Sequence, residues 1–395
     1  MIIRFFRTLL VHTILIMLPI LFATVAAGQA VTYRLDFVPF AEGATSQEVI
    51  RMNNLGMVVG RFIGGAGDTV GYVYDHPGML GSPNALYLLP DLIDVPGEWT
   101  SSGCWGINDH GQVVGYLSTL VDGVEQRVGF VMDLSTAIPT WKYLPTPAGS
   151  TFTWGMRIND NGHVVGVFRT AAGGNVDFGY FYHVAGDSAT DYELLSDPSS
   201  GQLLSFNTSS PGLNNLGQIS GRTANGWFRL TPGVTMESIQ DANLQVVEDI
   251  NDWGVLCGRA TMVTGTTKRG QTTTTQAGCF YDTQLNYVTG TFSAKTINNS
   301  NDMAVVFSPA GRPSYYRNNE GLISIDPMLS ANTTTADRDF WMEASVIANR
   351  LNERDSTGYP QIAGQATRTT TTGSGKTKVT TYDRRIFILT PELVP

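Results

Sequence analysis

A short pattern of hydrophobic and polar positions recurs seven times along the chain: an apolar residue, Asn, then Asn, Asp or Glu, a variable residue and usually glycine. The copies begin at Met52, Ile107, Ile158, Leu213, Ile250, Ile297 and Leu351. Successive copies lie 37 to 55 residues apart, a spacing typical of supersecondary units that stack on one another to bury their apolar faces. The pattern therefore predicts a repeat protein.

Each repeat carries the hydrophobic alternation of four short strands. The first strand ends at the pattern, and the second follows its turn, as in Val58–Gly60 of the first repeat. A third, aromatic strand comes next, as in Gly71–Tyr74, and six repeats continue into a fourth, as in Leu86–Leu89. This order predicts one four-stranded antiparallel sheet per repeat.

The seventh repeat lacks a fourth strand, because the sequence stops at Pro395 just after its third. A segment before the first repeat, Tyr33–Val38, resembles the fourth strands and is likewise followed by proline. Pairing it with the last sheet would close a ring and remove two exposed sheet edges. We therefore predict an all-β fold, a seven-bladed β-propeller over residues 31–395. The alternative is an open β-solenoid, which would need capping repeats.

The first thirty residues differ in character from the repeats. Arg4 and Arg7 precede an apolar run from Leu9 to Ala27 that ends in small residues. This pattern predicts a secretory signal peptide over residues 1–30 and a secreted protein, extracellular or periplasmic. The alternative is a retained membrane anchor. No later segment is apolar enough to cross a membrane, so we expect no membrane association after cleavage.

Composition narrows the possible partners. The formal charge of −9 becomes −11 once Arg4 and Arg7 are removed, which excludes the electrostatic signature of a nucleic-acid-binding protein. Charged residues make up only 15% of the chain, and its 43 glycines suit many strands joined by tight turns.

The repeat resembles a bacterial family, the HAF-type extracellular repeat, whose units carry an Ile-Asn-Asp-x-Gly-x-Val-Val-Gly core followed by an aromatic strand. The copies at Ile107 and Ile158 are closest to this pattern, and the resemblance covers nearly the whole chain after residue 30. It implies secretion and a propeller. It carries no catalytic residues to this chain.

The recurring Asn-Asp-x-Gly suits a tight turn, because Asn and Asp bond to nearby backbone amides and glycine accepts a positive φ. Repeated calcium sites are the alternative, but the recurring position offers only one acid in a turn, and Asn54, Asn215 and Asn299 replace it in three copies. Two histidines, His110 and His163, fall in equivalent turns of adjacent repeats and are fewer than the three or four ligands that a metal site needs. We therefore expect no metal, no cofactor and no catalytic residue.

Three arginines share the position just before the pattern: Arg51, Arg157 and Arg350. Asp249 holds that position in the fifth repeat. If the strand that ends at the pattern is innermost, these side chains lie near the central channel. They would then either bind a carboxylate or sulfate group or pair with Asp249, Glu248 or Glu353 and lock neighbouring blades together.

The loops that join fourth to first strands open on one face, here called the loop face, and several carry a large aromatic residue: Trp99, Trp154, Phe206 and Trp341. Loops on a rigid scaffold concentrate binding residues. These aromatics would stack on sugars or anchor a protein partner, or else fill gaps between blades.

Two threonine-rich hairpins extend from the same face, over Thr261–Ala277 and Thr367–Arg385. Both can pair as long antiparallel ribbons, and their basic residues are Lys268, Arg269, Lys376 and Lys378. They predict an interaction surface, with flexible insertions as the alternative.

Cys257 and Cys279 lie on adjacent strands of the fifth repeat, in a register that we expect to place them opposite one another. An oxidising compartment would favour a disulfide and leave Cys104 as a buried thiol. The alternative is that both are small apolar strand residues.

Two functions are compatible with these features. The first is a secreted, non-catalytic binding or scaffold module, monomeric, that recognises a glycan or a cell-envelope protein through the loop face. The second is a polysaccharide lyase or hydrolase with carboxylates at the channel mouth, which would need two acids close together. The repeats supply no such pair, so binding is the preferred function.

Overall fold

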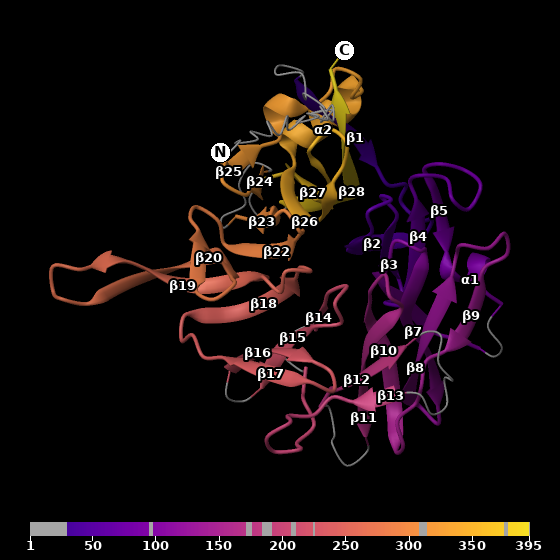
Figure 1. The fold of residues 1–395 in the computed structure, drawn as a ribbon. Coiled ribbons are helices and arrows are strands. Elements are labelled where there is room, and N and C mark those ends of the chain that lie inside the picture. The colour runs from indigo at the N-terminus through magenta and orange to yellow at the C-terminus, as the bar shows by residue number, and fades with distance from the viewer. Residues whose placement is uncertain are drawn as a thin grey trace, which may run out of the picture.

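The strands in the described part of the chain group into seven antiparallel four-stranded units, or blades, that follow one another in chain order (Figure 1). Five blades are separate sheets, and blades 2 and 3 form one eight-stranded sheet, because Phe152 pairs parallel with Arg127. The computed structural model describes residues 30–94, 98–170, 176–183, 192–206, 211–223, 226–307, 314–374 and 378–394. The predicted signal peptide lies outside these residues. Within them, no helix has the length and apolar character needed to cross a membrane.

Each of the first six blades runs from an inner to an outer strand in sequence order. Their strands are, for blade 1, β2 (Ala44–Met52), β3 (Val58–Gly64), β4 (Thr69–Asp75) and β5 (Ala85–Leu88); for blade 2, β6 (Ser101–Ile107), β7 (Gln112–Val121), β8 (Val124–Asp133) and β9 (Thr140–Tyr143); for blade 3, β10 (Ser150–Ile158), β11 (His163–Thr170), β12 (Phe178–His183) and β13 (Tyr192–Leu194); for blade 4, β14 (Gly212–Leu213), β15 (Ile219–Thr223), β16 (Gly226–Thr231) and β17 (Thr235–Ile239); for blade 5, β18 (Leu244–Ile250), β19 (Leu256–Thr266), β20 (Thr272–Tyr281) and β21 (Leu285–Val288); for blade 6, β22 (Ser293–Ile297), β23 (Met303–Val306), β24 (Ser314–Arg317) and β25 (Gly321–Ser324).

Blade 7 combines the two ends of the chain, as predicted. It consists of β26 (Ser345–Arg354), β27 (Pro360–Thr372), β28 (Val379–Leu393) and the N-terminal β1 (Val31–Phe37). β1 pairs antiparallel with β28 from Val31–Leu393 to Phe37–Phe387. Tyr33 and Leu35 of β1 are buried, so the strand supplies core as well as main-chain hydrogen bonds. The predicted β-propeller is confirmed, and the pairing of β1 with β28 fits the predicted closure of a seven-bladed ring.

Short helices occur only in loops of the described chain. They are α1 (Leu89–Leu92) after blade 1, and a 3-10 turn, η1 (Asp326–Met328), followed by α2 (Thr335–Glu343), between blades 6 and 7. Thr334 caps α2 by accepting a hydrogen bond from the Asp337 amide.

The apolar faces of neighbouring blades pack against each other and form the core. One cluster joins Val59 and Val73 of blade 1 to Val113 and Phe130 of blade 2, all fully buried. The glycine that ends the Val-Val-Gly strand lets the second strand approach the inner strand closely, because a Cβ atom on Gly60 would collide with the Glu48 carbonyl oxygen. Stacking of the repeats, as predicted, buries what a single blade would expose.

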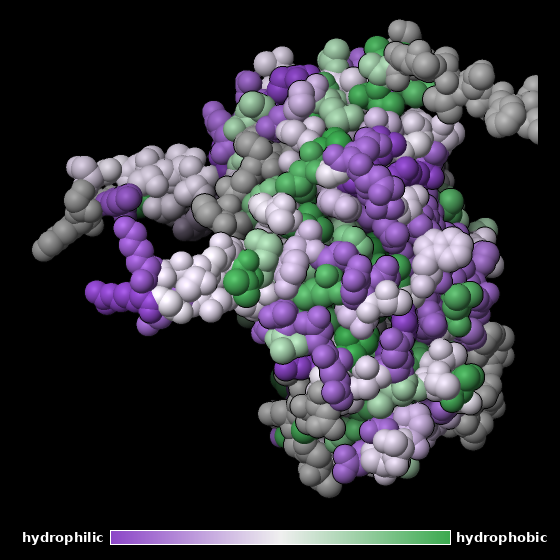
Figure 2. Space-filling view, turned by 60° about the vertical axis from the view of Figure 1, so that its left-hand side comes forward, coloured by the Kyte–Doolittle hydropathy of each residue, from purple (hydrophilic) through white to green (hydrophobic). Residues whose placement is uncertain are grey.

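Two hairpins extend beyond the ring as paired ribbons, in agreement with the sequence prediction. In β19–β20, pairing continues to Thr266–Thr272, and in β27–β28 it continues to Thr372–Val379. Figure 1 shows the β19–β20 arm reaching away from the body, and Figure 2 shows arms extending from one side of the molecule. Lys268, Arg269 and Lys378 are exposed, whereas Lys376 lies outside the described residues.

Candidate functional site

The recurring asparagine links each blade to the next around the channel. Its Nδ2 donates to the main-chain carbonyl of the equivalent asparagine in the following blade, and Asn352 of blade 7 donates back to Asn53 of blade 1. Six of these donor–acceptor distances are 2.8–3.0 Å and the last is 3.5 Å. We call this closed set the asparagine ring: Asn53, Asn108, Asn159, Asn214, Asn251, Asn298 and Asn352.

The next residue of each pattern forms a second closed set. Its side-chain oxygen accepts the main-chain N–H of its counterpart in the preceding blade, at 2.7–2.9 Å. We call this set the outer ring: Asn54, Asp109, Asp160, Asn215, Asp252, Asn299 and Glu353. Burial raises the pKa of Asp109, and the hydrogen bond from the Asn54 main-chain amide opposes this rise. Burial likewise raises the pKa of Glu353, against the hydrogen bond from the Asn299 main-chain amide.

Sequence reasoning explained these residues as local turn formers, which is only half of their role. The asparagine Oδ1 does bond within its own turn, as in the Met57 amide donating to Asn53 at 2.9 Å. The Nδ2 bond to the next blade was missed. The available signal was that Asn never varies at this position in seven copies, although Asp, Ser or Gly would also suit a turn.

The turn glycine was expected to need a positive φ. Gly56, Gly111, Gly162, Gly217 and Gly254 have φ of 73–83°. In blade 6, Asn301 takes the same conformation at 61°, and in blade 7 the turn is longer and ends at Gly358, with a φ of 78°.

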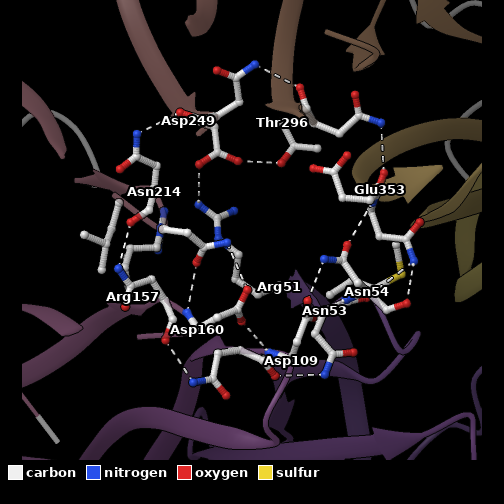
Figure 3. A pocket seen from close by; sticks show the side chains of 18 of the residues that line it. Arg51, Asn53, Asn54, Asp109, Arg157, Asp160, Asn214, Asp249, Thr296 and Glu353 are labelled. Carbon is white, nitrogen blue, oxygen red and sulfur yellow. Dashed lines mark hydrogen bonds and ion pairs between the residues drawn. The ribbon is translucent and has the colours of Figure 1, made fainter. Parts of the chain in front are cut away.

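The three arginines do converge in the channel, because the strands that carry them are innermost. Together with Asp249 and Thr296 they line a cavity of ≈ 180 Å³ at the turn end of the channel (Figure 3). Arg51 extends across this ring toward Asp249, with Nη2 3.7 Å from Oδ1. Asp249 also accepts a hydrogen bond from the Thr296 hydroxyl at 2.6 Å.

The other predicted acidic partners are engaged elsewhere. Glu248 pairs with Lys295 at 2.5 Å, and Glu353 accepts the Asn299 amide. Arg157 donates to the Met156 carbonyl at 2.7 Å, and Arg350 to the Asn349 carbonyl at 2.7 Å. The predicted locking ion pair is therefore present for Arg51 alone among the three arginines in the described structure.

Three of the four predicted loop-face aromatics fill gaps between blades rather than face solvent. Trp341 on α2 is fully buried, donates Nε1 to Asp326 at 2.8 Å and stacks edge-on against Phe387. Phe206 is 4% exposed and packs on Phe228. A buried ring offers no face to a ligand, so the structure corrects the binding role expected for both.

Trp154 also packs inside the molecule. Its ring contacts Trp105 at 5.1 Å between centroids, and the Arg127 guanidinium lies over it at 4.9 Å. Its neighbours therefore occupy the aromatic surface that the sequence reasoning offered to a ligand.

Trp99 is the aromatic that remains at a pocket. Half-buried, it lines a cavity of ≈ 520 Å³ between blades 1 and 2, together with Asp91, Asp94, Thr100 and Ser101. The cavity is formed by residues 89–94 and 99–102, by the beginning of β4 and by Leu117 of β7. It thus lies at the opposite end of the inner strands from the two rings, on the loop face.

The expected disulfide between Cys257 and Cys279 is wrong. The strand register pairs Cys257 with Phe280 and Cys279 with Gly258, so the two side chains lie one residue out of register and point to opposite faces of the blade. Cys257 joins the core toward blade 6, and Cys279 the core shared with Trp227 of blade 4. Both thiols are free and buried, as is Cys104.

The turn histidines have different surroundings. His110 is exposed, and His163 is half-buried beside Asn159 and stacks near Phe181. Within the described ranges, no group of three or more His, Cys, Asp or Glu residues is arranged to hold a metal ion.

Comparisons with known proteins support no family assignment. No family model and no curated protein matches the chain. The β-propeller domain of the trilobed protease from Pyrococcus furiosus is similar in structure, with 9% identity, a TM-score of 0.47, and coverage of 89% of this chain and 96% of that one.

Two enzymes give weaker structural similarity. An acylaminoacyl peptidase matches at 8% identity with a TM-score of 0.45, over 88% of this chain but only 57% of the peptidase. The polysaccharide lyase Uly1 matches at 7% identity with a TM-score of 0.34, over 88% and 77%. Likeness at this level carries no information about function, and the propeller is established by the sheet topology of the chain itself.

Proposed function

We propose that this chain is a secreted binding protein that takes a glycan into the Trp99 pocket on its loop face. The observation that carries the proposal is the pocket itself. Its volume of ≈ 520 Å³ falls within the range of about 300–1,000 Å³ usual for small-ligand sites.

The lining suits a sugar. An indole presents a flat apolar face, which matches the C–H face of a pyranose ring. Asp91 and Asp94 are exposed at the pocket and offer carboxylate oxygens to sugar hydroxyls as charge-assisted acceptors. Thr100 and Ser101 add hydroxyl oxygens that can accept from a sugar, although the Thr100 hydroxyl donates to the Ser118 carbonyl and the Ser101 hydroxyl bonds to that of Thr69.

Binding is favoured over catalysis by the setting of these acids. A glycosidase normally buries its acid against apolar groups so that the acid stays protonated near neutral pH. Asp91 and Asp94 are both exposed, which does not provide that environment. Two alternatives remain for the experiment to test: a polysaccharide-acting enzyme and a binding protein for a cell-envelope protein.

A glycan array probed with the mature protein tests the proposal. Trp99→Ala should abolish the signal of every bound glycan while leaving the protein folded, with some loss of melting temperature because Trp99 packs partly against the core between blades 1 and 2. The matched control is Trp253→Ala, because Trp253 is 73% exposed on the opposite, turn face, and this variant should bind normally.

Three outcomes would reject the proposed function. These are unchanged glycan binding by Trp99→Ala, retention of an envelope protein with no glycan bound, and release of new sugar ends from a bound polysaccharide. The last would establish the enzyme instead.

A further inference from the structure

The inner strands bulge just before the recurring pattern, and the bulge aims the arginines at the channel. The register shifts fall between Val49 and Arg51, between Gly155 and Arg157, and between Ala348 and Arg350. A bulge adds one residue to a strand and redirects the side chain beside it. Three guanidinium groups from three different blades therefore meet around one axis.

Few carboxylates lie beside the three arginines in the channel. The equivalent bulge of β18 aims Asp249 inward, and this carboxylate serves Arg51 and the Thr296 hydroxyl. Arg157 and Arg350 form no ion pair within the described residues and donate to main-chain carbonyls. Asp249 is therefore the one carboxylate of the described chain that contacts the cluster, while Glu248, which pairs with Lys295, acts on Arg157 and Arg350 only through its charge.

Two of the three guanidinium groups, those of Arg51 and Arg157, are also buried and incompletely hydrogen-bonded. Arg51 is 8% exposed and Arg157 is 6% exposed. Arg51 Nη2 and Arg157 Nε are buried without a hydrogen-bond partner. Burial, and then the charge of Arg51, lower the pKa of Arg350 to about 9 and bring that of Arg157 well below its usual range. An uncompensated buried charge is costly, so the cluster is energetically incomplete as it stands.

The outer-ring carboxylates do not supply the missing charge. They line the same cavity but follow the arginine position by three residues in each pattern, at the turn. There, Asp109, Asp160 and Asp252 accept main-chain N–H groups and neighbouring side-chain amides.

The geometry points to a second binding site, in which Arg51, Arg157 and Arg350 hold one small oxyanion, a carboxylate or a sulfate-type group. The cavity of ≈ 180 Å³ is far larger than the roughly 15 Å³ that a single water needs. The guanidinium fork matches two oxygens of such a group. Arg157 Nε has no hydrogen-bond partner, and Arg51 Nη2 has only the 3.7 Å contact with Asp249. The site lies in the channel at its turn end, whereas the Trp99 pocket lies between blades 1 and 2 on the loop face, so the site does not depend on the proposed glycan binding.

Titration calorimetry and thermal unfolding of the mature protein test this site with sodium sulfate and sodium acetate, each at constant ionic strength set with sodium chloride. We expect saturable binding of one sulfate or one acetate per chain and a matching rise in melting temperature. Arg157→Met should remove both effects. Arg222→Met is the control, because it deletes the same charge from an exposed position and should bind like wild type.

A variant that is expected to raise the affinity for the anion distinguishes an anion site from a purely structural cluster. Asp249→Asn removes the competing carboxylate and should tighten sulfate binding by about tenfold or more, since a unit charge a few ångströms away acts strongly in a partly buried site. A cluster that only stabilises the blades would be weakened by this change with no gain in affinity. Absence of saturable binding to the wild type, or equal binding by wild type and Arg157→Met, would overturn the inference. If Arg157→Met does not fold, the Asp249→Asn affinity alone decides.

Discussion

Replacement of Asn214 by alanine tests whether the asparagine ring holds the blades together. Asn214 is 3% exposed. Its Nδ2 donates to the Asn251 carbonyl at 2.9 Å and to Gln218 Oε1 at 2.8 Å, and its Oδ1 accepts the Gln218 amide at 2.8 Å. At about 1 kcal/mol for each net hydrogen bond, with further cost for buried groups left unpaired, the free energy of unfolding should fall by about 3–5 kcal/mol.

Urea unfolding followed by fluorescence measures this loss, provided that the slope with urea is unchanged between the proteins. Asn243→Ala is the control: Asn243 is exposed, and its loss should stay within about 0.5 kcal/mol. Asn214→Asp separates the local bond from the link between blades, because it keeps an oxygen for the Gln218 amide but loses the Nδ2 donor. If Asn214→Ala costs less than about 1 kcal/mol, or if Asn214→Asp is harmless, the ring does not couple the blades and a local turn role suffices.

Three further outcomes follow from the fold. Deletion of residues 31–40 removes β1, exposes the edge of β28 and should cause aggregation or a large drop in melting temperature; an unchanged melting temperature would contradict ring closure by β1. Trp341→Ala should lower the free energy of unfolding by about 3–5 kcal/mol, because it empties a fully buried site, and a loss as small as that of a surface variant would show that Trp341 is not a core residue. Thiol titration of the unreduced, denatured protein should detect three thiols. In the native protein the thiols should react slowly, because burial raises the pKa of Cys104 and raises that of Cys279 to about 12. Detection of a single thiol after denaturation would show that the disulfide forms.

The fold was predictable because its signals are local and repeated. The spacing of the copies from Met52 to Leu351 defines the blades, and Tyr33–Val38 is recognisable as the missing fourth strand from its own alternation. The inward position of Arg51, Arg157 and Arg350 followed from strand order alone.

Side-chain environments were less predictable, because they depend on contacts between blades and on single-residue register. A shift of one residue in the β19–β20 pairing turns Cys257 and Cys279 to opposite faces. Trp341 stands in a loop by sequence, but the loop folds into α2 and buries the indole against Phe387. Six of the seven Nδ2 bonds of the asparagine ring connect residues 37 to 55 positions apart, and the seventh connects Asn352 to Asn53, so all of them lie beyond the reach of a turn-based argument.

The hydrogen bonds of the asparagine ring differ in length. The longest one marks a place where unfolding can start, although a ring has no free ends. The longest hydrogen bond of the ring, 3.5 Å, joins Asn352 of blade 7 to Asn53 of blade 1. In the described ring this is the only contact between neighbouring blades that are far apart in the sequence. Transient separation should therefore begin there, and amide protons of β2 and β26 should exchange with solvent before those of β18. A protease that samples such openings would find its first cut at this seam, far from the exposed arms.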